Sequence, residues 1–265
     1  MIVLVTGGSS GIGGAACRLF AAKGATVYAA SRRGLLPEGA PSNVKAIAAD
    51  VTSPESVSAA VASIVEEEGR LDVVVCNAGN GIAGSIEETS LEEAKYQFET
   101  CFFGAHNTIR AVLPYFRAQG SGKIITTGSV ASVVPIPYQA FYSSAKAAVL
   151  MYTEALAMEL RPFGIQCCCI LPGDTKTGFT SARKYVAGAT ADSPYAAARS
   201  ASVGKMEKDE VNGMAPEVIA RAMVRQAYRR RMAMKVTPRI DYQAVNLLIK
   251  ILPARLMTRI VGMIY

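Results

Sequence analysis

The sequence is poor in the residues that build metal sites and disulfide frameworks. It has one histidine, His106, and six cysteines, with no C-x-x-C pair among them. Zinc sites need clustered cysteine and histidine ligands, and disulfide scaffolds need many cysteines in a short chain. We therefore predict no metal site, and free thiols such as a reducing cytoplasm maintains. On this view the triplet Cys167 to Cys169 fills a buried strand and is not a redox site.

Long apolar runs, linkers and internal repeats are also lacking. No run approaches the roughly 20 apolar residues of a membrane-spanning helix, and no Pro/Gly/Ser linker interrupts the 265 residues. The chain starts almost directly with a strand-like segment, residues 2–6, so we expect no secretory signal peptide. These features predict a single domain, residues 1–265, located in the cytoplasm.

The C-terminal part has few acidic residues. From Glu217 to Tyr265 there are ten Lys/Arg against two Asp/Glu, which more than accounts for the net charge of +7. Such a tail suits nucleic acid, an anionic membrane, or a solvated or subunit-packing surface. No groove-reading motif accompanies it, so we predict no nucleic-acid partner.

Short apolar runs alternate with longer helical patterns, which predicts an α/β fold with a parallel sheet. We expect strands at residues 2–6, 25–30, 44–49, 72–76, 123–127 and 165–171, and helices at residues 12–23, 54–69, 91–117 and 139–161. The unusual polar and glycine residues follow the strands directly. Because open parallel sheets bind ligands at the carboxyl ends of their strands, we expect the functional site there.

A glycine-rich turn, Thr6 to Gly13, follows the first strand and opens a helix. Its glycines permit a tight turn close to a diphosphate, and the helix N-terminus offers free N–H groups to it. The same segment contains G-x-S-x-G, the nucleophile elbow of serine hydrolases, with Ser9 as the nucleophile. A hydrolase of that kind needs a histidine late in the chain, and the single histidine is His106, so the dinucleotide interpretation is favoured.

The end of the second strand bears on the choice of cofactor. Ser31 stands where NAD sites usually place an acid for the ribose hydroxyls, and Arg32 follows it. A guanidinium can bind a 2′-phosphate through paired hydrogen bonds. We therefore predict NADP(H), with a solvated turn as the alternative role of Arg32 and Arg33.

Tyr142 and Lys146 lie four residues apart in a helical segment and so share one face. An ammonium at about 4 Å could lower the phenol pKa from its usual value of about 10 by up to about three units. We expect a tyrosine so placed to exchange protons near neutral pH. The alternative is a chance surface pair.

Taken together, these motifs resemble the short-chain dehydrogenase/reductases over nearly the whole chain. The matching motifs are Thr6 to Gly13, Asp50-Val51, Asn77-Ala78-Gly79, Ser129, Tyr142 with Lys146, and Pro172-Gly173, in family order. The resemblance implies a Rossmann-like doubly wound sheet and reversible hydride transfer between a nicotinamide and an alcohol or ketone.

The resemblance also implies roles for individual residues. Ser129 would bind the substrate oxygen, Tyr142 would transfer its proton, and Lys146 would hold the nicotinamide ribose and lower the tyrosine pKa. The implied cofactor-binding residues are Gly7, Ser9, Ser10, Gly11, Ile12, Gly13, Arg32, Asp50, Val51, Asn77, Ala78, Gly79, Tyr142, Lys146, Pro172, Gly173 and Thr175.

One position departs from the family pattern. Where the family usually has an asparagine that helps to hold a water beside the lysine, this chain has Cys101. Either main-chain groups hold that water and activity survives, which we favour, or the proton relay is weakened. The weakened relay would leave an NADP(H)-binding regulator with little turnover.

The segment 174–214 matches the part that closes over the substrate in this family. The apolar residues expected near the chemistry are Val130, Val133, Pro135, Ile136, Phe179 and Tyr185. They favour a hydrophobic alcohol or ketone, and a looser likeness points to hydroxysteroid and retinol dehydrogenases. A 3-oxoacyl or acyl-dihydroxyacetone phosphate reductase is the alternative.

The extension 241–265 alternates apolar residues with Lys250, Arg255 and Arg259 and is broken at Pro253. This pattern predicts two short amphipathic helices. They could pack across the pocket or a subunit interface of a homodimer or homotetramer, or lie on an anionic membrane surface.

Overall fold

A seven-stranded parallel sheet organises the molecule. The computed structural model describes residues 1–264, apart from the side chains of residues 245, 246, 249 and 250. The strands are β1 (Ile2–Thr6), β2 (Thr26–Ser31), β3 (Val44–Ala48), β4 (Val73–Cys76), β6 (Gly122–Thr127), β7 (Ile165–Ile170) and β9 (Lys235–Val236). Their order is β3-β2-β1-β4-β6-β7-β9, and every pair is parallel. The doubly wound fold predicted from the sequence is confirmed.

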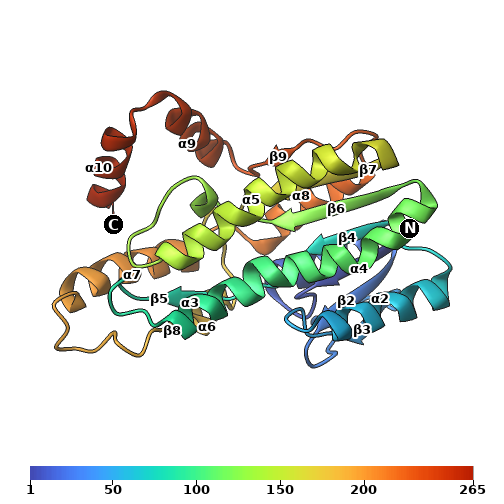
Figure 1. The fold of residues 1–265 in the computed structure, drawn as a ribbon, viewed down its shortest axis with the longest axis horizontal. Helices are drawn as coiled ribbons and strands as arrows, with labels where there is room; N and C mark the ends of the chain where they lie inside the picture. Colours follow the sequence, from blue (N-terminus) through green and yellow to red (C-terminus); the bar gives the residue numbers. More distant parts are fainter. Residues whose placement is uncertain (265) are drawn as a thin grey trace.

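Helices cover both faces of this sheet (Figure 1). They are α1 (Gly11–Ala21), α2 (Pro54–Glu68), α4 (Gly104–Gln119), α5 (Ala140–Leu160) and α8 (Pro216–Tyr228), with short 3-10 turns at Val130–Ser132 and Arg161–Phe163. The helix α3 (Leu91–Phe98) lies beyond the ends of the strands, beside β5 (Figure 1). One core cluster joins α1 and α8 to the sheet. A second joins α2, α4 and α5 to the opposite face.

The strands are buried because their residues are apolar on both sides. Val73, Val74 and Val75 of β4 have almost no exposed surface, as expected for a central parallel strand. The six cysteines are all buried free thiols, and Cys167 to Cys169 lie within β7. The interpretation of this triplet as strand filler is therefore confirmed.

One expected helix is divided. The sequence predicted a continuous helix over residues 91–117, but a π-helical turn, Glu99–Phe103, separates α3 from α4. Such turns often occur at functional sites because they redirect the side chains within a helix. Cys101 lies inside this turn and is buried.

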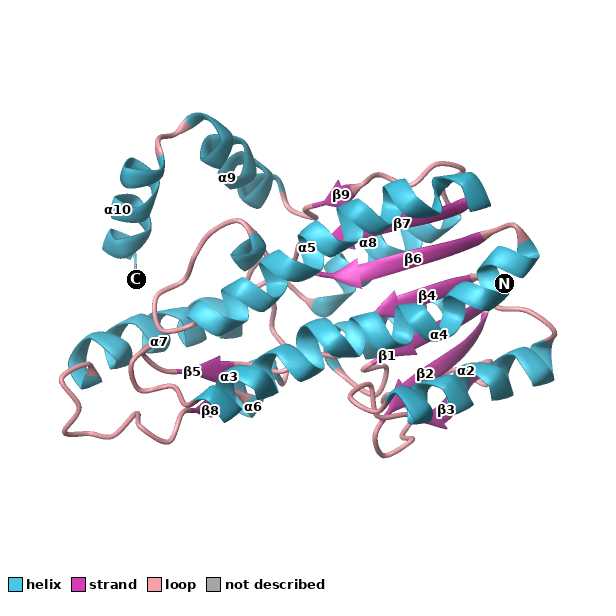
Figure 2. Cartoon of the chain, viewed as in Figure 1, coloured by secondary structure: helices cyan, strands magenta, loops and turns pink. Residues whose placement is uncertain are grey.

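The chain after β7 covers the carboxyl edge of the sheet. It holds α6 (Phe179–Ala182), β8 (Lys184–Tyr185) and α7 (Ala196–Val211). β8 pairs with β5 (Ile82–Ala83), which follows β4. We call residues 174–214 the lid, since they lie at the end of the sheet where the strands finish (Figure 2).

Two helices close the chain, α9 (Ile240–Ile251) and α10 (Ala254–Ile264), separated at Pro253 as predicted. They extend away from the sheet on the side of the lid (Figure 1). The side chain of Lys250 and residue Tyr265, both part of the sequence prediction for this extension, lie outside the described residues. Within residues 1–264, no helix combines the length and the apolar character needed to cross a bilayer.

Candidate active site

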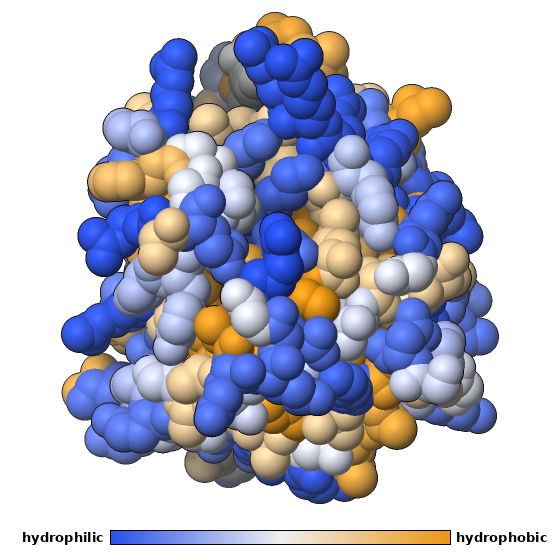
Figure 3. Space-filling view, turned by 90° about the vertical axis from the view of Figure 1, so that its right-hand side faces the viewer, coloured by the Kyte–Doolittle hydropathy of each residue, from blue (hydrophilic) through white to orange (hydrophobic). Residues whose placement is uncertain are grey.

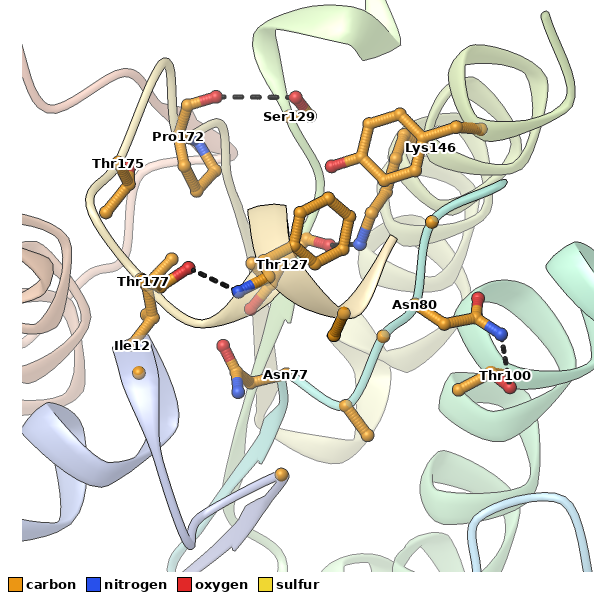
Figure 4. Close-up of a pocket in the computed structure, with 18 of the residues that line it drawn as sticks. Ile12, Asn77, Asn80, Thr100, Thr127, Ser129, Lys146, Pro172, Thr175 and Thr177 are labelled. Atoms are coloured by element: carbon orange, nitrogen blue, oxygen red, sulfur yellow. Dashed lines mark hydrogen bonds between the residues drawn. The ribbon is translucent and has the colours of Figure 1, made fainter. Parts of the chain in front are cut away.

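A cavity of about 1660 Å³ lies at the carboxyl ends of the strands. Its lining comes from the segments after β1, β2, β3, β4, β6 and β7, together with α3, the π-helical turn, α5, the lid and Tyr242. Figure 4 shows part of this lining. Strand order reverses between β1 and β4, and ligands bind at such a point in open α/β sheets. The opposite end of the molecule, where the strands begin, presents mainly hydrophilic side chains with small hydrophobic areas between them (Figure 3).

The glycine turn forms one wall of the cavity. Gly7 and Gly11 have positive φ angles of 65° and 53°, a conformation that side chains disfavour. A Cβ atom on Gly13 would stand 2.2 Å from the carbonyl oxygen of Gly7, so only glycine lets α1 approach the turn. Gly13 therefore acts beneath the surface and does not line the cavity, whereas Gly7, Ser9, Ser10, Gly11 and Ile12 do.

This turn is suited to a diphosphate. The side chain of Ser10, the N-cap of α1, makes no capping hydrogen bond, and the first helical turn contains no acidic residue. The backbone N–H groups at the start of α1 have no side-chain acceptor, and the helix dipole favours an anion beside them. Thr177 of the lid lies against Gly11, so the lid reaches over the same turn.

The predicted nucleoside end of the site is also assembled. Arg32, Asp50 and Val51 line the same cavity as the glycine turn. Asp50 accepts hydrogen bonds from the backbone N–H and hydroxyl of Thr52, which lower the pKa of its carboxyl. Asn107 of α4 donates its side-chain N–H to the Val51 carbonyl at 2.9 Å, which holds this corner in place.

The segment Asn77-Ala78-Gly79 crosses the floor of the cavity. The hydroxyl of Thr6 accepts hydrogen bonds from the backbone N–H groups of Asn77, at 3.0 Å, and Ala78, at 3.2 Å. The Asn77 amide donates to the Thr6 carbonyl at 3.2 Å. The two motifs are thus bonded to each other, which explains why Thr6 is buried although it is polar.

Ser129, Tyr142 and Lys146 meet in this cavity, as the sequence predicted. Lys146 donates an ammonium proton to the Thr127 carbonyl at 2.8 Å (Figure 4). Its nitrogen lies 5.8 Å from the centre of the Tyr142 ring. The Ser129 hydroxyl interacts with the Tyr142 phenol, accepts from the Ala131 N–H at 3.1 Å and donates to the Pro172 carbonyl at 3.5 Å.

The electrostatics of Tyr142 differ from the prediction. Burial raises the pKa of the phenol, and this effect exceeds the lowering by the Lys146 ammonium and by Ser129. Burial alone lowers the pKa of Lys146, but the acidic groups of Cys101, Tyr142 and Cys169 turn the net direction upward. The expected shift of the phenol toward neutral pH was therefore wrong for this structure, because desolvation of the phenolate outweighs the ammonium.

Cys101 lies near Lys146, but its sulfur contacts Gln97 and Asn80. Its sulfur is 3.1 Å from the Gln97 amide nitrogen and 3.4 Å from the Asn80 carbonyl oxygen. Gln97 is fully buried; it donates to Asn80 at 3.0 Å and accepts from the Ile82 N–H at 2.9 Å. This polar network, rather than an asparagine at position 101, holds the chain after Gly79.

The apolar residues predicted for the substrate are only partly brought together. Val130, Ile136 and Phe179 line the cavity, as do Val134 and Met206. Val133 does not, because it packs against the core cluster of Val149, Leu150, Cys169 and Leu171, and Pro135 is exposed outside the cavity. Tyr185 does not line it either, since its ring is half exposed and its hydroxyl points to Glu207 at 3.4 Å.

Pro172, Gly173 and Thr175 line the cavity as predicted. Among the lining residues that the sequence reasoning missed are Asn80, Thr177, Glu210 and Tyr242. The Tyr242 phenol donates to the Asp174 carboxylate at 2.6 Å and accepts from the Asp174 N–H at 3.1 Å. Asn80 directly follows the Asn77-Ala78-Gly79 motif and could have been predicted from it, whereas nothing in the sequence places Tyr242 near residue 174.

The serine-hydrolase alternative has no support in this arrangement. His106 pairs with the Tyr152 hydroxyl at 3.0 Å and is absent from the residues lining the cavity that contains Ser9. A Ser-His relay is therefore not assembled. Within residues 1–264, no three His, Cys, Asp or Glu side chains come together in a way that could hold a metal ion.

The residues present fit a nicotinamide dinucleotide. The cavity combines a glycine turn without a side-chain cap, a polar nucleoside corner and a buried lysine, of whose three donors one is bonded to Thr127. Its volume exceeds that of an ordinary small-molecule pocket, which is roughly 300–1,000 Å³. Space for a cofactor and a substrate side by side is thus available.

Comparisons with known proteins agree with this geometry. The chain is 41% identical over 229 residues to a 3-ketodihydrosphingosine reductase of Bacteroides thetaiotaomicron, which spans 86% of this chain and 84% of that protein. It is 35% identical over 191 residues to human 17-beta-hydroxysteroid dehydrogenase type 1, or 67% of this chain and 58% of that one. A solved short-chain dehydrogenase from Streptomyces avermitilis has a TM-score of 0.81 at 30% identity, covering 94% of each chain. The family model described as short chain dehydrogenase matches residues 1–185, and the protein is therefore an oxidoreductase of the short-chain dehydrogenase family.

Proposed function

We propose that this protein is an NADP(H)-dependent oxidoreductase that interconverts a secondary alcohol and a ketone on a hydrophobic substrate, and that it works mainly as a ketone reductase. The observation that carries the proposal is the meeting of Tyr142, Ser129 and Lys146 in the cavity that also holds the glycine turn. The 41% identity to a ketone reductase supports the direction.

The proton chemistry follows from the protonation state of Tyr142. When bound, the nicotinamide supplies the hydride. Because burial raises the pKa of Tyr142, its phenol is neutral at neutral pH and can donate a proton to the oxygen of the reduced ketone. Ser129 would orient that oxygen, since a hydroxyl both donates and accepts hydrogen bonds. Lys146, fixed by Thr127, would hold the cofactor ribose with its remaining donors.

The preference for NADP(H) over NAD(H) rests on Ser31 and Arg32. Both line the cavity next to the turn, and the Ser31 hydroxyl is already engaged, accepting from the Leu35 N–H at 3.2 Å. Strand β2 ends in Ser31 and is followed by Arg32, with no carboxylate there to bind ribose hydroxyls, and a guanidinium at this position would suit a 2′-phosphate. Replacing Arg32 by alanine should raise the KM for NADPH about tenfold and leave that for NADH unchanged. Arg110→Ala, an exposed arginine outside the cavity lining, is the matched control.

The cavity favours a long-chain ketone. Its substrate end is lined by Val130, Val134, Ile136, Phe179 and Met206, which suit an alkyl chain. The relative's substrate, 3-ketodihydrosphingosine, is a long-chain ketone with an amino group beside the carbonyl. We propose a substrate of this class in preference to a rigid hydroxysteroid, which the likeness to 17-beta-hydroxysteroid dehydrogenase keeps as the second candidate.

Charge in the lid supports an amino ketone. The Glu210 carboxylate lines the cavity, and Thr180 and Arg183 donate hydrogen bonds to it at 2.7 and 2.5 Å. Glu207 approaches the same guanidinium at 3.5 Å, so two carboxylates share one cation. An ammonium on the substrate would be attracted to the Glu210 side of the cavity, whereas a phosphate would bind better near Lys184, which lines the same cavity.

A panel of ketones decides among these substrates. Long-chain amino ketones, steroid ketones, retinoids, 3-oxoacyl thioesters and acyl-dihydroxyacetone phosphate are assayed for loss of NADPH, with Tyr142→Phe as the blank. We expect the highest kcat/KM for the long-chain amino ketone. If Tyr142→Phe and the natural chain are equally inactive on every ketone, the weakly active regulator is the better account.

We further propose that the chain acts as a homodimer or homotetramer, and its location in the cytoplasm stays a prediction. Sedimentation velocity of the purified protein gives the subunit number, and a monomer at micromolar concentration would contradict the first proposal.

A further inference from the structure

The helix α9 has two opposite faces with different contacts. Tyr242 points inward to Asp174 and lines the cavity. Ile240, Leu247 and Ile251 lie on the other side of the helix, within an arc of about 40° at 100° per residue. They are 82%, 60% and 70% exposed. Because Tyr242 fixes the rotation of α9, its apolar stripe is held outward and stays uncovered.

The helix α10 also exposes apolar side chains. Val261 is buried and attaches the helix on one side, while Leu256 and Met263, seven residues apart and so on one face, are exposed. A soluble helix normally turns its apolar stripe to the core. Here both helices carry exposed apolar side chains around the break at Pro253.

Cations flank the apolar residues. Arg255 and Arg259 are exposed, and in the described part of the chain neither forms an ion pair with a carboxylate. α10 contains no acidic residue. Arg239, before α9, is neutralised by Asp241 at 2.6 Å. Among the described side chains of this extension, the unpaired positive charge therefore lies on α10, beside Leu256 and Met263.

We propose that α9 and α10, residues 240–264, are a docking surface for an anionic lipid bilayer, on which the apolar stripe enters the interface and Arg255 and Arg259 contact lipid headgroups. A helix that is apolar on one face and basic beside it binds membranes in this way. A second copy of the chain is the less suitable occupant, because two such surfaces would bring four unpaired arginines together.

The docking surface lies close to the cavity. Tyr242 touches the cavity from the same helix whose opposite face carries the stripe. A bilayer bound to α9 would thus lie one helix diameter, about 10 Å, from the cavity lining. A lipid-like substrate could pass from the bilayer to the cavity over this short path, although the docking itself requires no particular substrate.

Vesicle sedimentation of the full chain tests the proposal. We expect binding to vesicles of phosphatidylcholine with about one third phosphatidylglycerol, little binding to phosphatidylcholine alone, and a decline as salt rises above about 100 mM. Leu247→Ser/Ile251→Ser and Arg255→Glu/Arg259→Glu should each weaken binding at least about tenfold. The matched controls are Ile86→Ser, an exposed apolar residue elsewhere, and Arg229→Glu/Arg230→Glu, which changes the net charge equally.

Each other outcome overturns the proposal. Failure of the natural chain to bind anionic vesicles at moderate salt would do so directly. Equal loss of binding in Arg229→Glu/Arg230→Glu would mean diffuse attraction without a defined surface. If the Leu247→Ser/Ile251→Ser protein keeps its lipid binding but changes its subunit number in sedimentation velocity, the stripe is a subunit contact. NADPH binding by each variant verifies that it is folded.

Discussion

The phenyl ring of Phe179 lies 5.6 Å from the ring of Tyr142, tilted by 53°. On its other side Phe179 packs on Gly81, where a Cβ atom would stand 2.8 Å from the ring. The Arg183 guanidinium lies 5.7 Å from the same ring. Phe179 thus packs beside both the Tyr142 ring and the Arg183 guanidinium.

Replacing Phe179 by alanine should reduce kcat/KM for a long-chain ketone about tenfold or more, because a buried phenyl ring contributes roughly 1.5–3 kcal/mol of apolar contact. A small cyclic ketone that cannot reach the lid should lose much less. The two kcat/KM values are compared, with the exposed Phe103→Ala as control. Equal losses for both ketones would mean that Phe179 acts on Tyr142 and not on the substrate.

Tyr142→Phe should lower kcat for ketone reduction about 10²- to 10⁴-fold, the usual contribution of a positioned proton donor. The cofactor contacts of the glycine turn and Lys146 stay in place, so NADPH binding, measured by its fluorescence, should change little. Retained turnover in this variant would end the proposed mechanism.

The pH dependence of reduction follows from the direction of the Tyr142 shift. A raised pKa favours the protonated phenol, so the donor is present below its ordinary value of about 10 and is lost above it. At saturating NADPH, kcat/KM should be constant from about pH 6 to 9 and fall above about pH 10. A decline centred near pH 7 would show that bound cofactor lets the Lys146 ammonium dominate over burial.

Gly173→Ala should disturb α9 because a methyl group there would stand 2.2 Å from the Tyr242 ring. We expect a rise of about tenfold in the KM for NADPH, since Gly173 lines the cofactor side of the cavity. Adding Tyr242→Ala removes the clash and should restore most of the affinity. If the double variant binds NADPH no better, residue 173 itself touches the cofactor.

The Cys101 environment gives a further prediction. Cys101→Asn should change kcat less than about threefold, because Gln97 already holds the adjacent chain. Gln97→Leu should lower the free energy of unfolding by about 1–3 kcal/mol, since it leaves the Ile82 N–H without its buried partner. Urea titration measures the second effect. A many-fold gain in turnover for Cys101→Asn would mean that the thiol weakens the proton relay.

Much of the site was predictable from sequence because its parts follow strands. Asn77, Ser129 and Pro172 each stand just after an apolar run, and parallel strands finish at one edge of the sheet. The periodicity of the tail likewise predicted α9, α10 and the break at Pro253. These features depend on local pattern and on a general rule of sheet topology, so no coordinates were needed.

The sequence by itself therefore determined the fold class, the glycine turn and the meeting of Tyr142 with Lys146. Only the tertiary structure decided that burial affects the pKa of Tyr142 more than the Lys146 ammonium does, that Gln97 holds the chain beside Cys101, and that Tyr185 lies outside the cavity. The contact of Tyr242 with Asp174 spans 68 residues. Desolvation and long-range contacts depend on which distant side chains surround a group, and that information is absent from any local stretch of sequence.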